Sequence, residues 1–243
     1  SSDLDVESGV VKPAAVILEV IQGKGGVNPA PIEWLKQVRR VTKELDILLI
    51  IDEVQTGFCR TGRWFAYQYA GIDPDMIVMS KAIGGGLPLA VLGIKKQYDA
   101  WQAGNHSGTF RGNQLAMATG LATLEYLKDH DMASYVAEMG AWFMAELNGL
   151  QKRYPRIGHV RGRGLMIGME IIDPDLPRQS DGSYPADSAA AASIQQACFR
   201  HGLVIEKGGR GGTVLRLLPP LNVTKDELHQ VLDKLERALQ ENQ

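Results

Sequence analysis

The stretch Leu48-Leu-Ile-Ile-Asp-Glu-Val-Gln55 decides the fold of this 243-residue chain. A run of aliphatic residues is typical of a strand that is buried on both faces of a sheet, and the acidic pair marks its carboxyl end. A second apolar run, Met76-Ile-Val-Met79, ends in the same way at Ser80-Lys81. Because ligands of open α/β sheets bind at the carboxyl ends of the strands, we expect Asp52 and Lys81 at one ligand-binding edge.

Around these two runs the sequence predicts strands that alternate with helices, which indicates an α/β fold. Strands are expected over 14–19, 48–54, 76–80 and 89–94, and helices over 31–44, 114–128 and 132–154. The remainder is predicted to be a smaller α+β unit. Its strands are expected over 164–172, 203–206 and 213–218, and its helices over 189–201 and after a capping box at 224–227. The sequence therefore predicts two domains, 1–133 and 134–243.

The composition is that of an ordinary globular protein, with 44% hydrophobic and 22% charged residues and a formal charge of −2. A charge this close to zero does not indicate nucleic-acid binding, and no apolar run is long enough to span a membrane. We therefore expect neither nucleic acid nor a membrane as a partner. Cys59 and Cys198 favour a reduced, cytoplasmic protein over a disulfide framework. A buried-looking strand follows the polar start almost at once, so the chain is expected to begin in the middle of a sheet domain.

The pair Asp52-Glu53 by itself supports two kinds of site equally. An apolar strand that ends in these residues is typical of the Walker B segment of P-loop ATPases, where the aspartate serves Mg²⁺. No G-x-x-x-x-G-K-[ST] segment accompanies it, because Gly23-Lys24-Gly25 lacks the Ser or Thr. Lys81 favours a pyridoxal phosphate site instead, in which the lysine forms the Schiff base and the aspartate pairs with the pyridine nitrogen. No metal site is then expected.

Further polar positions have a structural explanation beside a functional one. Thr109 lies in a loop before a predicted helix, where a hydroxyl and backbone amides can hold a phosphate, although a plain turn explains it better. Arg216 lies inside an apolar strand and fits either bidentate carboxylate recognition or a salt bridge. Arg60 beside Glu53 is interpreted as a structural ion pair.

Together these residues resemble the class III (ω-amino acid) aminotransferases of fold type I. The resemblance rests on Leu49-Ile-Ile-Asp-Glu-Val-Gln-Thr-Gly-Phe-Cys-Arg-Thr-Gly62 and on Ser80-Lys-Ala-Ile-Gly-Gly-Gly-Leu-Pro88. Two further segments are similar to the bacterial diaminobutyrate–2-oxoglutarate aminotransferases. They are Glu19-Val-Ile-Gln-Gly-Lys-Gly-Gly-Val-Asn-Pro29 and His106-Ser-Gly-Thr-Phe-Arg-Gly-Asn-Gln-Leu-Ala116, of which the second is shared with ectoine-pathway enzymes.

The resemblance implies a large pyridoxal-phosphate-binding domain with a mixed sheet, followed by a small C-terminal domain. It implies transfer of the 4-amino group of L-2,4-diaminobutanoate to 2-oxoglutarate, which gives L-aspartate 4-semialdehyde and L-glutamate. Lys81 would bond the cofactor and shuttle a proton, and Asp52 would keep the pyridine nitrogen protonated. Gln55 would hydrogen-bond the phenolic oxygen of the ring, and Val54 would pack against a ring face.

The family also implies a homodimer with a shared active site, in which Thr109 reaches the cofactor phosphate of the neighbouring subunit. Arg216 would bind the α-carboxylate of glutamate or 2-oxoglutarate. Family members usually carry glutamate where Lys24 stands, and that glutamate pairs with the arginine while the ω-amino substrate is bound. We therefore expect weaker discrimination between the two half-reactions, which Lys24→Glu would test.

Family chains are nearly twice this length, and the part without a counterpart here is the N-terminal half. Three alternatives stay open from the sequence. They are another ω-aminotransferase (ornithine, acetylornithine or 4-aminobutyrate), a P-loop ATPase half, and a non-catalytic fragment that exposes apolar surface.

Overall fold

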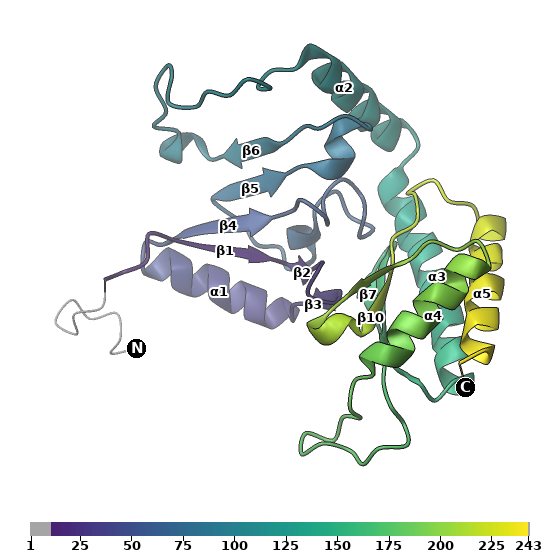
Figure 1. The fold of residues 1–243 in the computed structure, drawn as a ribbon. Helices are drawn as coiled ribbons and strands as arrows, with labels where there is room; N and C mark the ends of the chain where they lie inside the picture. The colour runs from purple at the N-terminus through teal and green to yellow at the C-terminus, as the bar shows by residue number, and fades with distance from the viewer. Residues whose placement is uncertain (1–10, 243) are drawn as a thin grey trace.

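The computed structural model describes residues 11–242, which form two sheets with helices packed against them (Figure 1). The first sheet has the order β1 (Ala15–Glu19), β4 (Leu48–Asp52), β5 (Met76–Met79) and β6 (Val91–Ile94). The first three strands are parallel and β6 is antiparallel to β5. The carboxyl ends of β4 and β5 therefore meet at one edge, as expected for Asp52 and Lys81.

Helix α1 (Ile32–Glu44) packs against this sheet and encloses a first core, in which Leu35, Leu49 and Ile51 are buried. Pro31 stands immediately before the first helical residue, where its missing N–H costs nothing. The short hairpin of β2 (Ile21–Gln22) and β3 (Asn28–Pro29) follows β1 and contacts the second sheet, so it joins the two halves of the fold.

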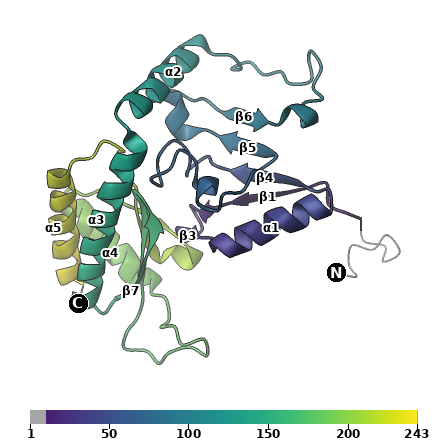
Figure 2. The same ribbon diagram turned by 180° about the vertical axis from the view of Figure 1, so that it is seen from behind.

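The second sheet is antiparallel, in the order β7 (Ile157–Arg163), β8 (Met166–Ile171), β10 (Val214–Leu217) and β9 (Glu206–Gly208). It packs with α3 (Met132–Arg153), α4 (Ser188–Arg200) and α5 (Lys225–Gln240) around the larger core, and Figure 2 shows α3 alongside β7. Helix α2 (Gln114–Asp129) leads into α3. The mixed α/β class is confirmed, whereas the domain boundary stays a prediction; it falls in the first turn of α3.

The second sheet differs from the prediction at two strands. The segment predicted over 203–206 becomes a strand only from Glu206 onward, since β9 runs to Gly208. Strand β7 was not predicted, because Gly158 and Gly162 and the arginines around them interrupt its apolar pattern. The capping box of the last helix is confirmed, with Thr224 and Glu227 bonded to each other's backbone amides.

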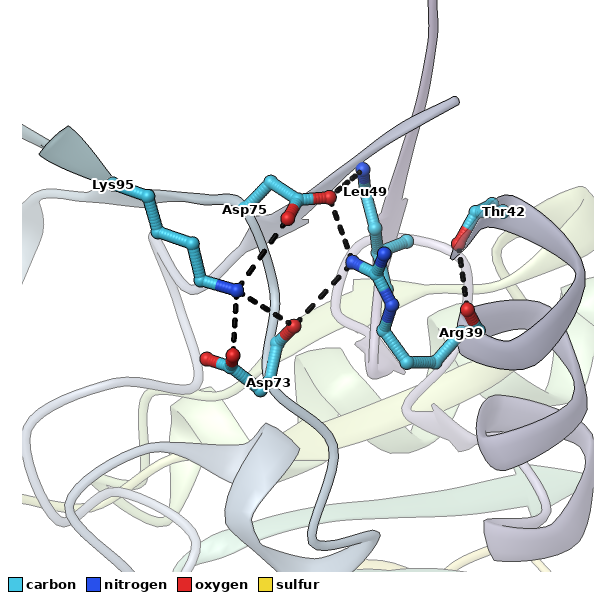
Figure 3. Close-up of polar contacts among 6 residues, drawn as sticks. All are labelled: Arg39, Thr42, Leu49, Asp73, Asp75 and Lys95. Atoms are coloured by element: carbon cyan, nitrogen blue, oxygen red, sulfur yellow. Dashed lines mark hydrogen bonds and ion pairs between the residues drawn. The ribbon is translucent and has the colours of Figure 1, made fainter. Parts of the chain in front are cut away.

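An ion-pair network around buried Asp75 fixes the opposite edge of the first sheet (Figure 3). Asp75, directly before β5, accepts hydrogen bonds from the Leu49 amide at 2.9 Å and from Arg39 of α1 at 2.7 Å. Lys95, directly after β6, contacts Asp75 at 3.4 Å and Asp73 at 2.5 Å. Because these groups tie α1, β4, β5 and β6 together, they fix the strand register that places Asp52 and Lys81.

Large apolar side chains are exposed on β1, on β6 and on the α2 region. Among them, Ile17 is 62% exposed, Phe110 88%, Leu115 71% and Leu121 58%. In residues 11–242 no helix combines the length and apolar character that crossing a bilayer requires.

Candidate active site

A cavity of about 410 Å³ lies between the carboxyl edge of the first sheet and the second sheet. The loop after β4, the turn after β5 and strands β9 and β10 all contribute to its lining. The lining residues are Val54, Gln55, Gly57, Arg60, Lys81, Ala82, Val204, Ile205, Glu206, Arg216 and Leu218. The structure thus brings together four of the predicted site residues, namely Val54, Gln55, Lys81 and Arg216.

Lys81 begins a short 3-10 helix, Lys81–Gly84, directly after β5. Its φ of 53° lies in the left-handed region, which a lysine rarely adopts. The preceding residue is anchored, because the Ser80 hydroxyl donates to the Leu89 carbonyl at 2.8 Å. Backbone conformations of this kind collect at functional sites, and here the conformation brings Lys81 to the cavity.

Asp52 is the last residue of β4 and is not among the residues that line the cavity. Its Oδ1 accepts a hydrogen bond from the Val54 amide at 2.9 Å, which fixes the carboxylate at the strand end. Glu19 stands in register with it at the end of β1, and the Glu19 carboxylate accepts from the Gly23 amide at 2.7 Å. The carboxyl ends of β4 and β1 therefore hold two carboxylates that backbone amides keep in position.

Gln55 connects the first sheet to Arg216 of β10. Its Oε1 accepts a hydrogen bond from Arg216 Nη2 at 2.8 Å. Since a guanidinium carries only donors, the amide oxygen must face it, and the Gln55 amide nitrogen is then left to donate. The side chain fits because position 23 is glycine: a Cβ there would lie 2.2 Å from Gln55 Oε1.

Arg216 is the most buried charged side chain of the cavity, with 3% of it exposed. Its Nη1 donates to Glu206 at 2.7 Å, while its Nε is buried and has no partner among the described residues. Gly208 makes room for it, since a Cβ there would lie 2.5 Å from Arg216 Cδ. Sequence reasoning missed Glu206, Gly23 and Gly208, although the acidic residue at the end of the 203–206 segment was a usable signal.

The interpretation of Arg60 and Glu53 as an ion pair is wrong. Arg60 donates to the carbonyls of Leu165 at 3.2 Å and Pro219 at 2.5 Å, and burial lowers its pKa to about 10. Buried Glu53 instead accepts from the Thr56 hydroxyl and from the Tyr67 amide, and burial raises its pKa. Both carboxylate oxygens of Glu53 are engaged within the fold, so its role there is structural.

Thr109 and Lys24 lie outside the cavity lining. Thr109 is exposed and precedes α2 by five residues, and Asn113 rather than Thr109 caps that helix. The Lys24 ammonium lies 3.4 Å from the Lys207 carbonyl, so its nearest described partner is backbone. Within residues 11–242, His, Cys, Asp and Glu side chains form no group of three or more that could hold a metal ion.

Comparison with known proteins identifies the family of this chain. The sequence model of the family described as Aminotransferase class-III matches residues 7–239. A diaminobutyrate–2-oxoglutarate aminotransferase of Haemophilus influenzae is 55% identical over 97% of this chain and 52% of its own length. A namesake from Rhizobium meliloti is 51% identical over 97% of this chain and 50% of its own length.

The fold is also found among solved structures. The crystal structure of a Bacillus anthracis aminotransferase matches 94% of this chain and 52% of its own with a TM-score of 0.85 and 31% identity. The chain thus spans about half the length of the curated relatives it matches. From the family match over most of its length, we conclude that this chain belongs to the class-III aminotransferase family.

Proposed function

We propose that this chain supplies the catalytic lysine and the acid-binding arginine of a pyridoxal-phosphate-dependent aminotransferase. The observation that carries the proposal is the single cavity into which Lys81, Gln55, Val54 and Arg216 converge from distant parts of the sequence. Membership of the class-III aminotransferase family supports this activity over that of a P-loop ATPase. When bound, pyridoxal phosphate supplies an aldehyde that amines condense with and a ring that accepts electrons.

The residues present fit this group. Lys81 lines the cavity and can hold and return a proton there. The Gln55 amide nitrogen is oriented to donate to a ring oxygen, because its amide oxygen faces Arg216. Asp52, held by the Val54 amide, would keep a proton on the ring nitrogen, and Val54 offers an apolar surface to a ring face.

The substrates we propose are L-2,4-diaminobutanoate and 2-oxoglutarate, with L-aspartate 4-semialdehyde and L-glutamate as products. The names of the relatives from Haemophilus influenzae and Rhizobium meliloti support this choice. Arg216 would bind the α-carboxylate of the oxo acid, because its guanidinium lines the cavity and a guanidinium can pair with both oxygens of a carboxylate.

We further propose a cytoplasmic homodimer in which Thr109 reaches the cofactor phosphate of the second subunit. The exposed position of Thr109, next to Phe110 at 88% exposure, and the exposed apolar side chains of α2 support an interface on this side.

The test is a spectroscopic panel of amino donors. The chain is loaded with pyridoxal phosphate, and 2,4-diaminobutanoate, ornithine, acetylornithine and 4-aminobutyrate are added separately. We expect 2,4-diaminobutanoate to change the cofactor absorbance fastest, and Lys81→Ala to abolish the change. A faster response to another donor would overturn the substrate assignment, and no response to any donor would overturn the proposed activity of this chain.

A further inference from the structure

We propose that Glu206 is an internal competitor for Arg216, which a substrate carboxylate must displace before it can bind. The proposal rests on the proposed function for the identity of the acid, and it adds a specificity-determining residue to that site. The residue concerned is Glu206, which forms an ion pair with Arg216. Lys24 is not involved, since its ammonium contacts only a backbone carbonyl among the described residues.

The two members of this ion pair differ sharply in exposure. The Arg216 side chain is 3% exposed, whereas the Glu206 side chain is 69% exposed. They are neighbours because β9 and β10 are antiparallel and place the two residues opposite each other. Glu206 can therefore turn into solvent and become hydrated, while Arg216 is held by Gln55 and by the close approach of Gly208.

Charge explains why Arg216 pairs with Glu206. Three of its lining residues are cations, namely Arg60, Lys81 and Arg216, against which Glu206 is the one carboxylate in the lining. A buried guanidinium without an anion is strongly unfavourable, so the glutamate stabilises Arg216 until another carboxylate arrives. Three cations against one anion also leave a net positive lining, which attracts a dicarboxylate.

A substrate carboxylate can pair with Arg216 more completely than Glu206 does. Glu206 reaches the guanidinium with one oxygen, which accepts from Nη1, while Nη2 donates to Gln55. A carboxylate free to orient itself can accept from two nitrogens at once, which is the stronger geometry. Displacement of Glu206 therefore exchanges a single hydrogen bond for a bidentate one and keeps a carboxylate beside Arg216.

The experiment measures glutarate, an unreactive dicarboxylate, binding to the chain by isothermal titration calorimetry without cofactor. We expect Glu206→Gln to bind glutarate about fivefold more tightly than the wild type, the size expected for release of a half-exposed ion pair. Glu206→Asp, which keeps the charge on a shorter stem, should give an intermediate affinity. The matched control is Glu170→Gln, which breaks the Arg161–Glu170 ion pair elsewhere on the same sheet and should change nothing.

Equal or weaker glutarate binding by both Glu206 variants, or no binding by any of these chains, would overturn the inference. Thermal unfolding of each variant separates loss of binding from loss of the fold, and Glu206→Asp provides the answer if Glu206→Gln does not fold. Because the titration contains no pyridoxal phosphate, its result is independent of whether Lys81 bonds the cofactor. The proposed function can therefore be overturned while this inference holds, and this inference can be overturned while the proposed function holds.

Discussion

Gln55 Oε1 accepts a hydrogen bond from Arg216 Nη2 at 2.8 Å, across a sequence separation of 161 positions. This bond joins the carboxyl edge of the first sheet to the second sheet, and it links a proposed cofactor ligand to a proposed substrate ligand. A substitution or ligand that moves Gln55 or Arg216 must therefore change the hydrogen bonding of the other side chain.

Gln55→Glu separates the two roles of this side chain. The carboxylate still accepts from Arg216, but the donor that we assign to the cofactor is lost. We expect at least a tenfold weaker affinity for pyridoxal phosphate, because hydrogen bonds to charged groups contribute about 1.5–3 kcal/mol. An absorbance titration measures it, with exposed Gln102→Glu as the control. Unchanged affinity would mean that Gln55 does not donate to the cofactor.

Gly23→Ala tests the close approach that holds Gln55 in place. The new Cβ would lie 2.2 Å from Gln55 Oε1, so the flexible side chain must turn away and break its bond to Arg216. We expect a small change in melting temperature but several-fold weaker glutarate binding by calorimetry. Gly108→Ala, which meets no atom within 4 Å, should leave both quantities as they are. Wild-type glutarate affinity in Gly23→Ala would show that the bond does not matter for binding.

Asp75→Asn removes the anion at the centre of the ion-pair network (Figure 3). Burial alone would raise the pKa of Asp75, but the Leu49 amide, Arg39 and Lys95 together lower it. A lowered pKa stabilises the fold above the unfolded-state value of about 3.9, and this stability is lost as the pH falls through the folded-state pKa.

We expect Asp75→Asn to reduce the free energy of unfolding by about 2–4 kcal/mol at neutral pH, since it leaves Arg39 and Lys95 without their buried partner. The difference should shrink as the pH falls below about 4. Urea denaturation across this range measures it, with exposed Asp233→Asn on α5 as the control. A constant difference at every pH would contradict the assigned titration.

Glu53 should make the free energy of unfolding depend on pH in the opposite direction, and Glu53→Gln tests this. Burial raises the pKa of Glu53, so the folded chain binds more protons than the unfolded chain once the pH exceeds the unfolded-state value. The stability contributed by the protonated form is present below about pH 4.3 and is lost as the pH rises through the folded-state pKa. In Glu53→Gln this loss should disappear, which the same denaturation series detects. A wild-type slope in the variant would show that Glu53 is not its source.

Much of the fold could be predicted because its strongest signals are local. The apolar runs of β4 and β5, the start of α1 after Pro31 and the capping box of α5 each depend on neighbouring residues. Strand β7 lacks such a signal, because glycines and arginines interrupt it and its pairing with β8 decides its structure.

The site could be predicted only in part, for the same reason. Lys81 and Gln55 follow strongly marked strands, but the pairing of Glu206 with Arg216 depends on the register of β9 against β10. The interpretation of Arg60 and Glu53 was wrong because nearness in sequence does not fix side-chain direction. The turn after β4 sends Arg60 toward the Leu165 and Pro219 carbonyls and Glu53 into the fold.

The central claim is that Lys81 is the lysine that bonds the cofactor, and borohydride reduction tests it most directly. The chain is incubated with pyridoxal phosphate, reduced, digested and mapped by mass spectrometry, beside Lys81→Ala and the exposed-site control Lys96→Ala. We predict a phosphopyridoxyl adduct confined to Lys81, absent from Lys81→Ala and retained in Lys96→Ala. Adducts scattered over surface lysines, or none at all, would contradict the account.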